Sequence, residues 1–422
     1  MKKIAVLISG GVDSSVALAL LKDQGHDLTA FYLKIWLEDE LSYLGSCPWE
    51  QDLEFVRGVC DKLDVPLQIV SMQQAYHERV VSYMLEDIKA GRTPNPDMLC
   101  NQQVKFGAFY DAIDASGVHF DYIATGHYAQ IEHGPQGAIL KKGKDPVKDQ
   151  TYFLAYLSQA QLSRALFPIG GFEKHEVRAL AKKYDLPTQD RKDSQGICFL
   201  GKFQFSDFLK AHLGTKKGDL IEFETGKKLG HHEGFWFYTI GQRQGLGLSG
   251  GPWYVTSKDP VKNIVFISKA YAEVAQHKAG MVVSGFNWNN PVLMPKEFDK
   301  MLDPVVKPQE ISEGNKVSLD VRFRHGPAVH PAQVLVQDSG LATPGANQEF
   351  LFVSLDTAIE STGDKISSTL ISCGLTTGSS IDKRVLEIIL KEESKQGIAA
   401  GQFAVLYDGD VCLGGGIIEQ AL

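Results

Sequence analysis

A glycine- and serine-rich turn lies close to the start of the chain. Its sequence, Ser-Gly-Gly-Val-Asp-Ser-Ser at 9–15, follows the apolar run Ile4–Ile8 and precedes the apolar-periodic stretch Val16–Leu21. This pattern predicts a buried strand, a tight turn and a helix start. Glycines let the backbone approach a ligand closely, and the N-terminus of a helix favours an anion. A phosphate or pyrophosphate is therefore the expected occupant, and Asp13 is placed to hold a Mg²⁺ ion that bridges phosphates.

Two cysteines stand in settings that favour the reactive thiolate. Cys100 follows Thr-Pro-Asn-Pro-Asp at 93–97, where Asp97 is a suitable N-cap and the thiol is expected in the first helical turn. Asp97 is also placed to exchange a proton with a group docked at this helix end. Cys198 has the cationic neighbours Arg191 and Lys192. For Cys100 taken alone, a buried structural thiol is an equally good interpretation.

The turn and the thiols together suggest a sulfur-transfer reaction. The turn lacks the Gly-Lys-Ser/Thr ending of the lysine-bearing phosphate loop, and it resembles the loop of enzymes that split ATP into AMP and pyrophosphate. Splitting ATP can adenylate a carbonyl oxygen, which a sulfur nucleophile then replaces. A second thiol can release that sulfur by attacking a persulfide.

The elements that must position these groups alternate between strand-like and helix-like segments up to about residue 200. Such alternation predicts an α/β fold with a doubly wound, mostly parallel sheet, Rossmann-like in form. Ligands of these sheets lie beyond the carboxyl ends of the strands, where the turn at 9–15 and Gly126-His127 are both found. The expected strands are Ile4–Ile8, Leu28–Leu33, Leu67–Val70 and Tyr122–Thr125, and the expected helices are Asp52–Leu63, Tyr76–Ile88, Val104–Ile113, Gln159–Leu166 and Lys174–Tyr184.

At 422 residues the chain is too long for one core, and we expect three domains. The first is an ATP-pyrophosphatase catalytic domain at 1–205. A small β-rich domain at 206–278 follows, with alternating runs such as Phe235–Ile240. A β-barrel-like domain at 279–422 is expected to carry an insertion at about 338–398, in which Asp382–Lys391 is predicted to be a helix; the resemblance described below implies that this domain contacts tRNA.

Composition limits the location and the partners of the chain. The net charge of −8 argues against indiscriminate nucleic-acid binding, although local basic clusters leave RNA open. No window approaches the length and apolarity of a membrane span, and the N-terminus leaves no room for a leader unless one has been removed. Six scattered cysteines without C-x-x-C spacing indicate a reducing compartment and no metal site. We expect a cytoplasmic protein, with an organelle stroma or matrix as the alternative.

Taken together, the motifs of this chain resemble those of the tRNA-specific 2-thiouridylases. The resemblance covers essentially residues 1–336 and 398–420. The matching strings are Ser-Gly-Gly-Val-Asp-Ser-Ser at 9–15, Gly-Arg-Thr-Pro-Asn-Pro-Asp at 91–97 with Leu-Cys-Asn at 99–101, Thr-Gly-His-Tyr at 125–128, Lys-Asp-Gln-Thr-Tyr-Phe at 148–153, Asp-Ser-Gln-Gly-Ile-Cys-Phe at 193–199 and Tyr-Thr-Ile-Gly-Gln-Arg at 238–243.

The resemblance implies an enzyme that places sulfur on C2 of the wobble uridine of tRNA. ATP activates the C2 oxygen and yields AMP and pyrophosphate. By the same resemblance, Cys198 carries a persulfide received from a sulfur-donor protein, and Cys100 is the partner nucleophile that can form a disulfide with it. Asp97 is the implied acid/base, and Asn95, Pro96 and Asp97 lie against the target base.

The resemblance also implies binding positions for both substrates. Those for ATP are Leu7, Ile8, Ser9, Gly10, Gly11, Val12, Asp13, Ser14, Ser15, Leu33 and Gly126. Those for tRNA are His127, Lys148, Asp149, Gln150, Arg322, Phe323 and Gln402.

Two other functions fit parts of the sequence. The nearer is another AMP-forming ATP pyrophosphatase that joins an amine or ammonia to an adenylated carbonyl, which requires ATP but no thiol. The other is a non-enzymatic tRNA-binding or nucleotide-sensing protein, which would bind ATP without releasing pyrophosphate.

Overall fold

A five-stranded parallel sheet forms the centre of the N-terminal part of the chain. The computed structural model describes residues 1–35, 49–192, 204–270, 280–296, 298, 316–338, 384–391 and 397–422. The strand order is β3-β2-β1-β4-β7, and every neighbouring pair is parallel. The strands are β1 (Lys3–Leu7), β2 (Asp27–Lys34), β3 (Leu67–Ser71), β4 (Tyr122–Ala124) and β7 (Ala165–Leu166).

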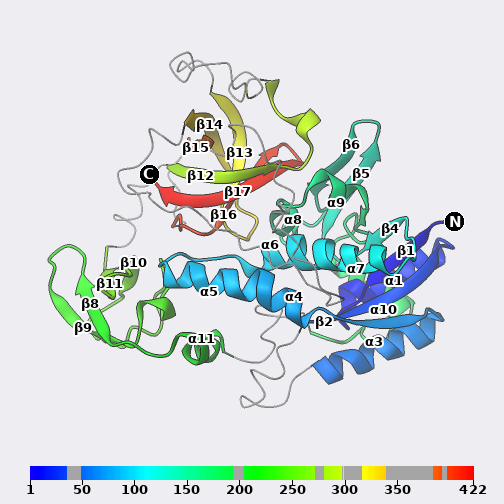
Figure 1. Cartoon of the computed structure of the whole chain (residues 1–422), viewed down its shortest axis with the longest axis horizontal. Helices are drawn as coiled ribbons and strands as arrows, with labels where there is room; N and C mark the ends of the chain where they lie inside the picture. Colours follow the sequence, from blue (N-terminus) through cyan, green and yellow to red (C-terminus); the bar gives the residue numbers. More distant parts are fainter. Residues whose placement is uncertain are drawn as a thin grey trace, which may run out of the picture.

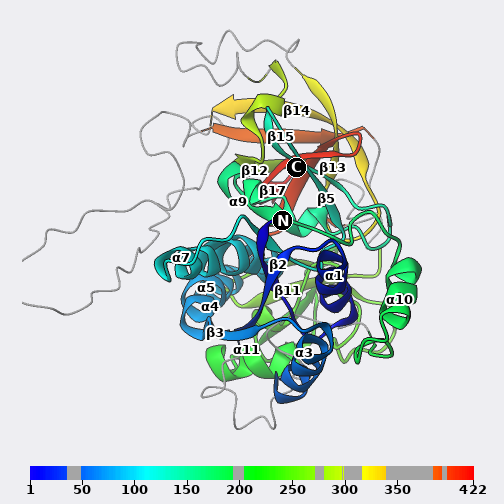
Figure 2. The same cartoon turned by 90° about the vertical axis from the view of Figure 1, so that its right-hand side faces the viewer.

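Helices cover both faces of this sheet (Figure 2). Both faces need cover because successive residues of each strand point to opposite sides and enter two different cores. Ile4 and Val6 pack with one layer, and Ala5 and Leu7 pack with the other. The first layer comprises α1 (Val12–Asp23), α3 (Trp49–Leu63) and α10 (Lys174–Lys183). The second comprises α4 (Gln73–Tyr76), α5 (Ser82–Lys89), α6 (Pro96–Leu99) and α7 (Phe109–Ala115). The predicted doubly wound α/β fold is thereby confirmed.

Two segments of the second layer are π-helical, so their turns are wider than those of an α-helix. His77–Val81 joins α4 to α5, and Cys100–Ala108 joins α6 to α7. The sequence predicted a helix in both places but not the wider turn, which accommodates an additional residue.

The predicted helix Gln159–Leu166 is only partly correct. Helix α9 ends at Ser163, and Ala165–Leu166 forms β7 at the edge of the parallel sheet. The short helix α8 (Thr151–Leu154) and the hairpin of β5 (Ala129–Gly134) and β6 (Gly137–Lys142) complete this part of the chain.

A four-stranded sheet follows the short helix α11 (Phe205–Leu213). Its order is β10-β11-β8-β9, and a separate apolar cluster packs against it. Phe235–Phe237 is a 3₁₀ turn rather than the expected alternating run, because the side chains of Phe235 and Trp236 pack toward the sheet from a turn. The strands are β8 (Gly218–Glu222), β9 (Lys228–His232), β10 (Tyr254–Asp259) and β11 (Ile264–Ser268).

The C-terminal strands close into an antiparallel barrel, at the top of Figure 1. Closure occurs because β12 pairs with both β15 and β17. The hairpin β5–β6 joins the barrel at one point, where Lys141 pairs with Val411 of β17. The strands are β12 (Gly280–Trp288), β13 (Val317–Arg322), β14 (His330–Asp338), β15 (Arg384–Leu390), β16 (Phe403–Asp408) and β17 (Val411–Ala421).

The helix predicted at Asp382–Lys391 is wrong. Residues 384–390 form β15, which lies between β12 and β14. The reason is an alternation of period two: Leu386, Ile388 and Leu390 face the barrel core, while the residues between them are less buried.

Candidate active site

The glycine turn at 9–15 has the geometry of an anion-binding loop. It leaves β1 at its carboxyl end, and Gly11 is the N-cap of α1. Gly10 has φ +77°, and a Cβ there would lie 2.7 Å from the carbonyl oxygen of Asp52. The Ser9 amide donates to Ser14 Oγ at 3.2 Å, which ties the turn to the first turn of α1. The expected strand–turn–helix is therefore present, with the loop amides at a helix N-terminus.

Gly126 closes against this loop from the neighbouring strand β4. A Cβ at this position would lie 2.6 Å from the Ser14 backbone nitrogen and 2.8 Å from the Asp13 carbonyl carbon. The two backbones thus meet with no room for a side chain. Leu33, at the end of β2, packs on the other side of the sheet with the second helix layer.

The Asp13 carboxylate is already held by two side chains. Lys174 Nζ lies 2.7 Å from Oδ1 and 2.9 Å from Oδ2, and the Tyr128 hydroxyl donates to Oδ1 at 2.7 Å. Asp13 is the single carboxylate in residues 7–15. No group of three or more His, Cys, Asp and Glu side chains in the described part of the chain forms a metal-binding cluster. In this conformation, therefore, Asp13 is engaged by a lysine rather than presented to a metal ion.

Lys174 and Arg191 are site residues that the sequence analysis did not identify in this role. Arg191 Nη1 donates to the Gly10 carbonyl at 2.6 Å, and Nη2 binds Asp52 Oδ1 at 2.7 Å. Both basic residues lie more than 150 positions beyond the loop, so no local motif points to the pairing. The one signal in the sequence was that Lys174 begins helix α10, since a helix that follows a strand of a parallel sheet can reach the edge where the glycine turn lies.

Asp97 lies in the first turn of α6, but it is not the N-cap. The cap is Asn95, whose side-chain oxygen accepts from the Met98 amide at 3.2 Å, and Pro96 occupies the first helical position. Asp97 Oδ1 is buried and has no hydrogen-bond partner among the described residues. A buried polar atom without a partner is uncommon and indicates that a hydrogen-bonding group from outside the described residues belongs there.

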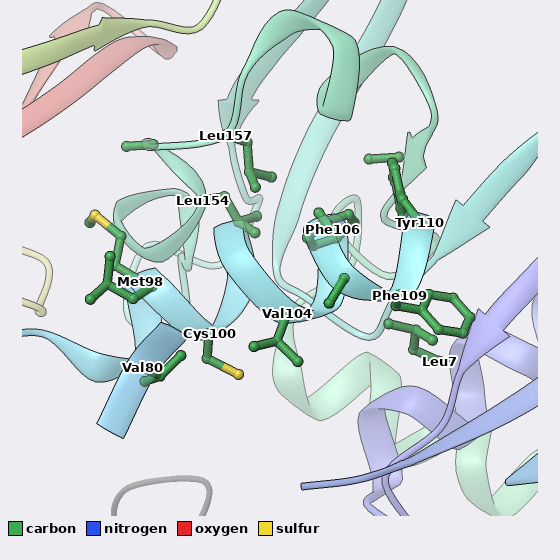
Figure 3. Close-up of a cluster of buried hydrophobic side chains, with 14 of the residues drawn as sticks. Leu7, Val80, Met98, Cys100, Val104, Phe106, Phe109, Tyr110, Leu154 and Leu157 are labelled. Atoms are coloured by element: carbon green, nitrogen blue, oxygen red, sulfur yellow. The ribbon is translucent and has the colours of Figure 1, made fainter. Parts of the chain in front are cut away.

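Cys100 lies one turn further along than expected, at the start of the π-helical segment. Its side chain is 1% exposed and packs near Val80 and Val104 (Figure 3). The same apolar cluster includes Leu7, the last residue of β1 before the glycine turn. One core therefore supports both the loop and the helix that carries Asp97 and Cys100.

Cys198 falls outside the described residues, but both flanks of its segment are placed. Arg191 lies at the glycine turn, as described above. Phe208 of α11 packs in the cluster that contains Cys100. The described residues on either side of this segment thus include one at the glycine turn, Arg191, and one in the large apolar cluster that contains Cys100, Phe208.

His127 is placed at the carboxyl end of β4, as expected. Its Nδ1 lies 2.7 Å from Thr125 Oγ1, and its ring contacts Phe106 and Phe167. Burial, with a smaller contribution from Lys105, holds the pKa of His127 well below its ordinary value. The ring is therefore neutral at physiological pH.

Asp149 and Arg322 form a buried ion pair between the catalytic region and the barrel. Arg322 Nη1 binds Asp149 Oδ2 at 2.6 Å, and the side chains are 3% and 1% exposed. Asp149 also accepts from the hydroxyl of Thr151 at 2.8 Å and from the Gly143 amide at 2.9 Å. Phe323 is buried as well, with its ring stacked on His330 at 4.9 Å.

The remaining expected tRNA positions are less buried. Lys148 is partly exposed, and Gln150 accepts from the Tyr128 amide at 2.9 Å. Gln402 donates from Nε2 to the carbonyl oxygens of Thr93 and Pro94, at 2.7 and 3.1 Å. The side chains of Asp149, Arg322, Phe323 and Gln402 therefore bind or pack against protein groups in this conformation.

No helix in the part of the chain that the structure describes has the length and apolarity needed to cross a membrane.

Comparison with known proteins identifies three domain families along the chain. The tRNA methyl transferase HUP domain matches residues 2–202, and the tRNA methyl transferase PRC-barrel domain matches 206–269. The aminomethyltransferase beta-barrel domain matches 368–418.

Three full-length relatives are named as tRNA-specific 2-thiouridylases. A tRNA-specific 2-thiouridylase MnmA of Parabacteroides distasonis is 40% identical over 99% of this chain and 98% of the relative. Its counterpart in Porphyromonas gingivalis is 39% identical over 99% of both chains. A tRNA-specific 2-thiouridylase MnmA 1 of Bacteroides thetaiotaomicron is 38% identical over the same shares.

Proposed function

The chain belongs to the tRNA-specific 2-thiouridylase family, and from this premise we propose that Cys100, Cys198 and Asp97 carry out its sulfur transfer beside an ATP bound at residues 9–15. The enzyme is a tRNA sulfurtransferase that converts uridine to 2-thiouridine. The observation that best supports this assignment of residues is the apolar cluster that includes both Leu7 and Cys100, because the glycine turn and the thiol-bearing helix rest on the same core.

ATP is proposed to lie with its phosphates on the turn. The proposed donors are the loop amides and the Ser9 hydroxyl. The hydroxyls of Ser14 and Ser15 donate to the Gly11 carbonyl at 3.3 and 2.8 Å and so hold the turn, and Gly126 leaves room for the loop backbone. Leu33 offers an apolar contact at the end of β2. Because Lys174 already binds Asp13, direct coordination of Mg²⁺ by this carboxylate does not fit the observed arrangement. We therefore propose that Mg²⁺ arrives on the triphosphate, while Lys174 neutralises Asp13.

The proposed reaction balances in three steps. The uridine C2 oxygen attacks the α-phosphorus of ATP, pyrophosphate leaves, and the oxygen becomes part of an adenylate. The terminal sulfur of a Cys198 persulfide then attacks C2, and AMP leaves with the oxygen. Attack of the Cys100 thiolate on the inner sulfur breaks the S–S bond of the persulfide, leaving sulfur on C2 and a Cys100–Cys198 disulfide. A thiol reductant must restore both cysteines before the next turnover.

Asp97 is proposed to exchange the proton that this chemistry moves at the base. Its buried, unpaired Oδ1 and its position between Pro96 and Cys100 support the assignment. Asn95, Pro96 and Asp97 would then face the target base together.

The partners and the domain division complete the proposal. tRNA is the substrate, and of the positions that the resemblance implies we propose direct contacts at His127, Lys148 and Gln150. The other four, Asp149, Arg322, Phe323 and Gln402, are engaged within the protein in this conformation. A persulfide-bearing protein would load Cys198, in the cytoplasm. The proposed domains are 1–205, 206–278 and 279–422, and within the last β14 and β15 are joined by the segment 339–383, which lies outside the described residues.

Mass spectrometry of tRNA nucleosides after incubation with ATP, Mg²⁺ and a persulfide donor tests this function. We expect 2-thiouridine from the wild-type protein, and none from Cys100→Ala or Cys198→Ala although pyrophosphate is still released. Cys60→Ala is the matched control, because Cys60 lies in the other core, on α3. Unmodified uridine from the fully supplied wild-type protein would refute the proposal, as would full activity of both cysteine variants.

A further inference from the structure

The segment that leads into Asp97 is bound by the barrel. We call residues 91–96, which follow α5 and end at the first residue of α6, the Asp97 loop. The Thr93 amide donates to the Ala400 carbonyl at 2.8 Å, and Gln402 Nε2 donates to the carbonyls of Thr93 and Pro94. The two hydrogen bonds of Gln402 join positions that are 309 and 308 residues apart.

The composition of the loop explains why an amide side chain serves here. Pro94 and Pro96 have no N–H group, so the loop cannot pair as a strand, and its carbonyl groups need donors from elsewhere. The amide nitrogen of Gln402 carries two hydrogens and meets two carbonyl oxygens. A carboxylate of the same shape would offer no hydrogen and would repel both oxygens.

The barrel side of this contact is closely fitted. Gly401 has φ +87°, and a Cβ there would lie 2.9 Å from both Arg92 Cβ and the Thr93 nitrogen. The turn is fixed to β17, because the Gly401 amide donates to the Ile418 carbonyl and the Ile418 amide donates to the Gln402 carbonyl, each at 2.8 Å. A displacement of Gln402 would therefore require a displacement of the barrel itself.

The other contacts of the loop leave the orientation of Asp97 to this brace. Arg92 is bound to Asp87 at the end of α5, and Asn95 caps α6. Asp97 Oδ1 itself has no hydrogen bond among the described residues, so no direct contact of that oxygen sets its position. Besides the electrostatic interaction of Asp97 with the His325 ring, the path of the loop is what aims the carboxylate.

We propose that Gln402 is a positioning residue for the thiolation reaction: its amide holds the Asp97 loop on the barrel and thereby aims Asp97 at the target base. The inference rests on the proposed function, since it gives Asp97 its role. It differs from the tRNA contact that the resemblance implies, because the amide hydrogens of Gln402 bind the protein's own carbonyls.

Steady-state thiolation by Gln402→Glu distinguishes the two roles. We expect kcat to fall by about tenfold or more, because a small misplacement of a catalytic group is costly. We expect KM for tRNA to stay within about twofold of the wild-type value, because ground-state RNA binding is unchanged. Gln402→Lys, which restores a donor, is expected to recover most of kcat. The matched control is Gln333→Glu, the same change at a partly exposed glutamine of β14.

A second variant moves the loop without changing charge. Gly401→Ala places a methyl group against Arg92 and Thr93, and it should lower kcat in the same way while the thermal unfolding midpoint confirms that the protein is folded. A raised KM for tRNA with unchanged kcat in Gln402→Glu would overturn the inference, as would an unchanged Gly401→Ala. The wild-type protein distinguishes failure of this inference from failure of the proposed function, because only the latter predicts that the wild-type protein makes no 2-thiouridine.

Discussion

Lys174 Nζ lies 2.7 and 2.9 Å from the two carboxylate oxygens of Asp13, across 161 positions of sequence. This ion pair sets the charge at the N-terminus of α1, where the phosphates are proposed to bind. We expect Lys174→Met to lower kcat/KM for ATP, measured by tRNA-dependent pyrophosphate release. A charge-assisted hydrogen bond contributes about 1.5–3 kcal/mol, which corresponds to roughly ten- to hundredfold.

Lys144→Met is the control for this variant. Lys144 binds Glu176 at 2.8 Å on the same side of the molecule, but both side chains are well exposed. Exposed pairs contribute little, so this change should leave ATP use unaltered. An equal fall of kcat/KM for ATP in the two variants would mean that Lys174 acts only through the net charge of the protein and not through its contact with Asp13.

Gly126→Ala should impair the loop although it adds only a methyl group. The new Cβ would lie 2.6 Å from the Ser14 nitrogen, a backbone atom that cannot rotate away. We expect pyrophosphate release to fall at least about tenfold, since misplaced loop amides no longer meet the phosphates. Gly134→Ala, where nothing lies within 4 Å of the added carbon, is the matched control. A Gly126→Ala enzyme with wild-type KM and kcat would contradict the close approach described here.

Arg322→Met should destabilise the protein strongly. It leaves the Asp149 carboxylate buried without its cation, which typically costs about 3–5 kcal/mol. Thermal unfolding should show a lowered midpoint, and Arg322→Met combined with Asp149→Asn should be less destabilised than the sum of the single changes. Lys141→Met, which removes an exposed pair with Glu132, should change the midpoint little. Additive effects of the two changes would argue against a direct pair.

Two buried thiols are expected to be unreactive. Burial, with the nearby Asp61 carboxylate, raises the pKa of Cys60 to about 11; burial, with Asp149, raises the pKa of Cys412 to about 12. At pH 8 no more than about a thousandth of either thiol is ionised. Peptide mass spectrometry should therefore find both unmodified by iodoacetamide in the folded protein and modified after denaturation. Rapid labelling of folded Cys60 would contradict its burial.

The same shifts give a direction to the dependence of stability on pH. Both folded pKa values lie above the ordinary thiol value of 9.0. Their stabilising contribution is therefore complete below pH 9 and is lost as the pH rises toward 11–12. Replacing Cys60 by Ala should reduce the loss of the unfolding midpoint between pH 9 and 11.

The sequence could predict those features that depend on local periodicity. Strands β1 to β4 and helix α1 have the apolar spacing of their elements, and the glycine turn has the residues of a tight turn; each was confirmed, whereas β7 was mistaken for the end of a helix. The strand β15 was mistaken for a helix because charged residues follow it and its alternation is short. The cap was assigned to Asp97 because Asp and Asn are both good caps, whereas Pro96 at the first helical position favours Asn95.

Features that depend on long-range pairing could not be predicted. Asp149 and Arg322 look from the sequence like polar residues free to meet RNA, and only the folded chain brings them together in a buried pair. Lys174 and Asp13 are likewise joined only by the packing of α10 beside α1. Local patterns carry no information on which distant charge a buried charge will meet.

The widened helix that begins at Cys100 has a consequence for the register of the active site. An α-helix turns by about 100° per residue, so the additional residue of a π-helical turn rotates all that precedes it relative to all that follows. Removing one residue between Asn101 and Lys105 would let the segment narrow, and the sulfur atom would swing away from Val80 while Phe109 kept its packing against Phe31. The direction in which the Cys100 side chain points relative to the sheet therefore depends on the number of residues in this segment as much as on their identity.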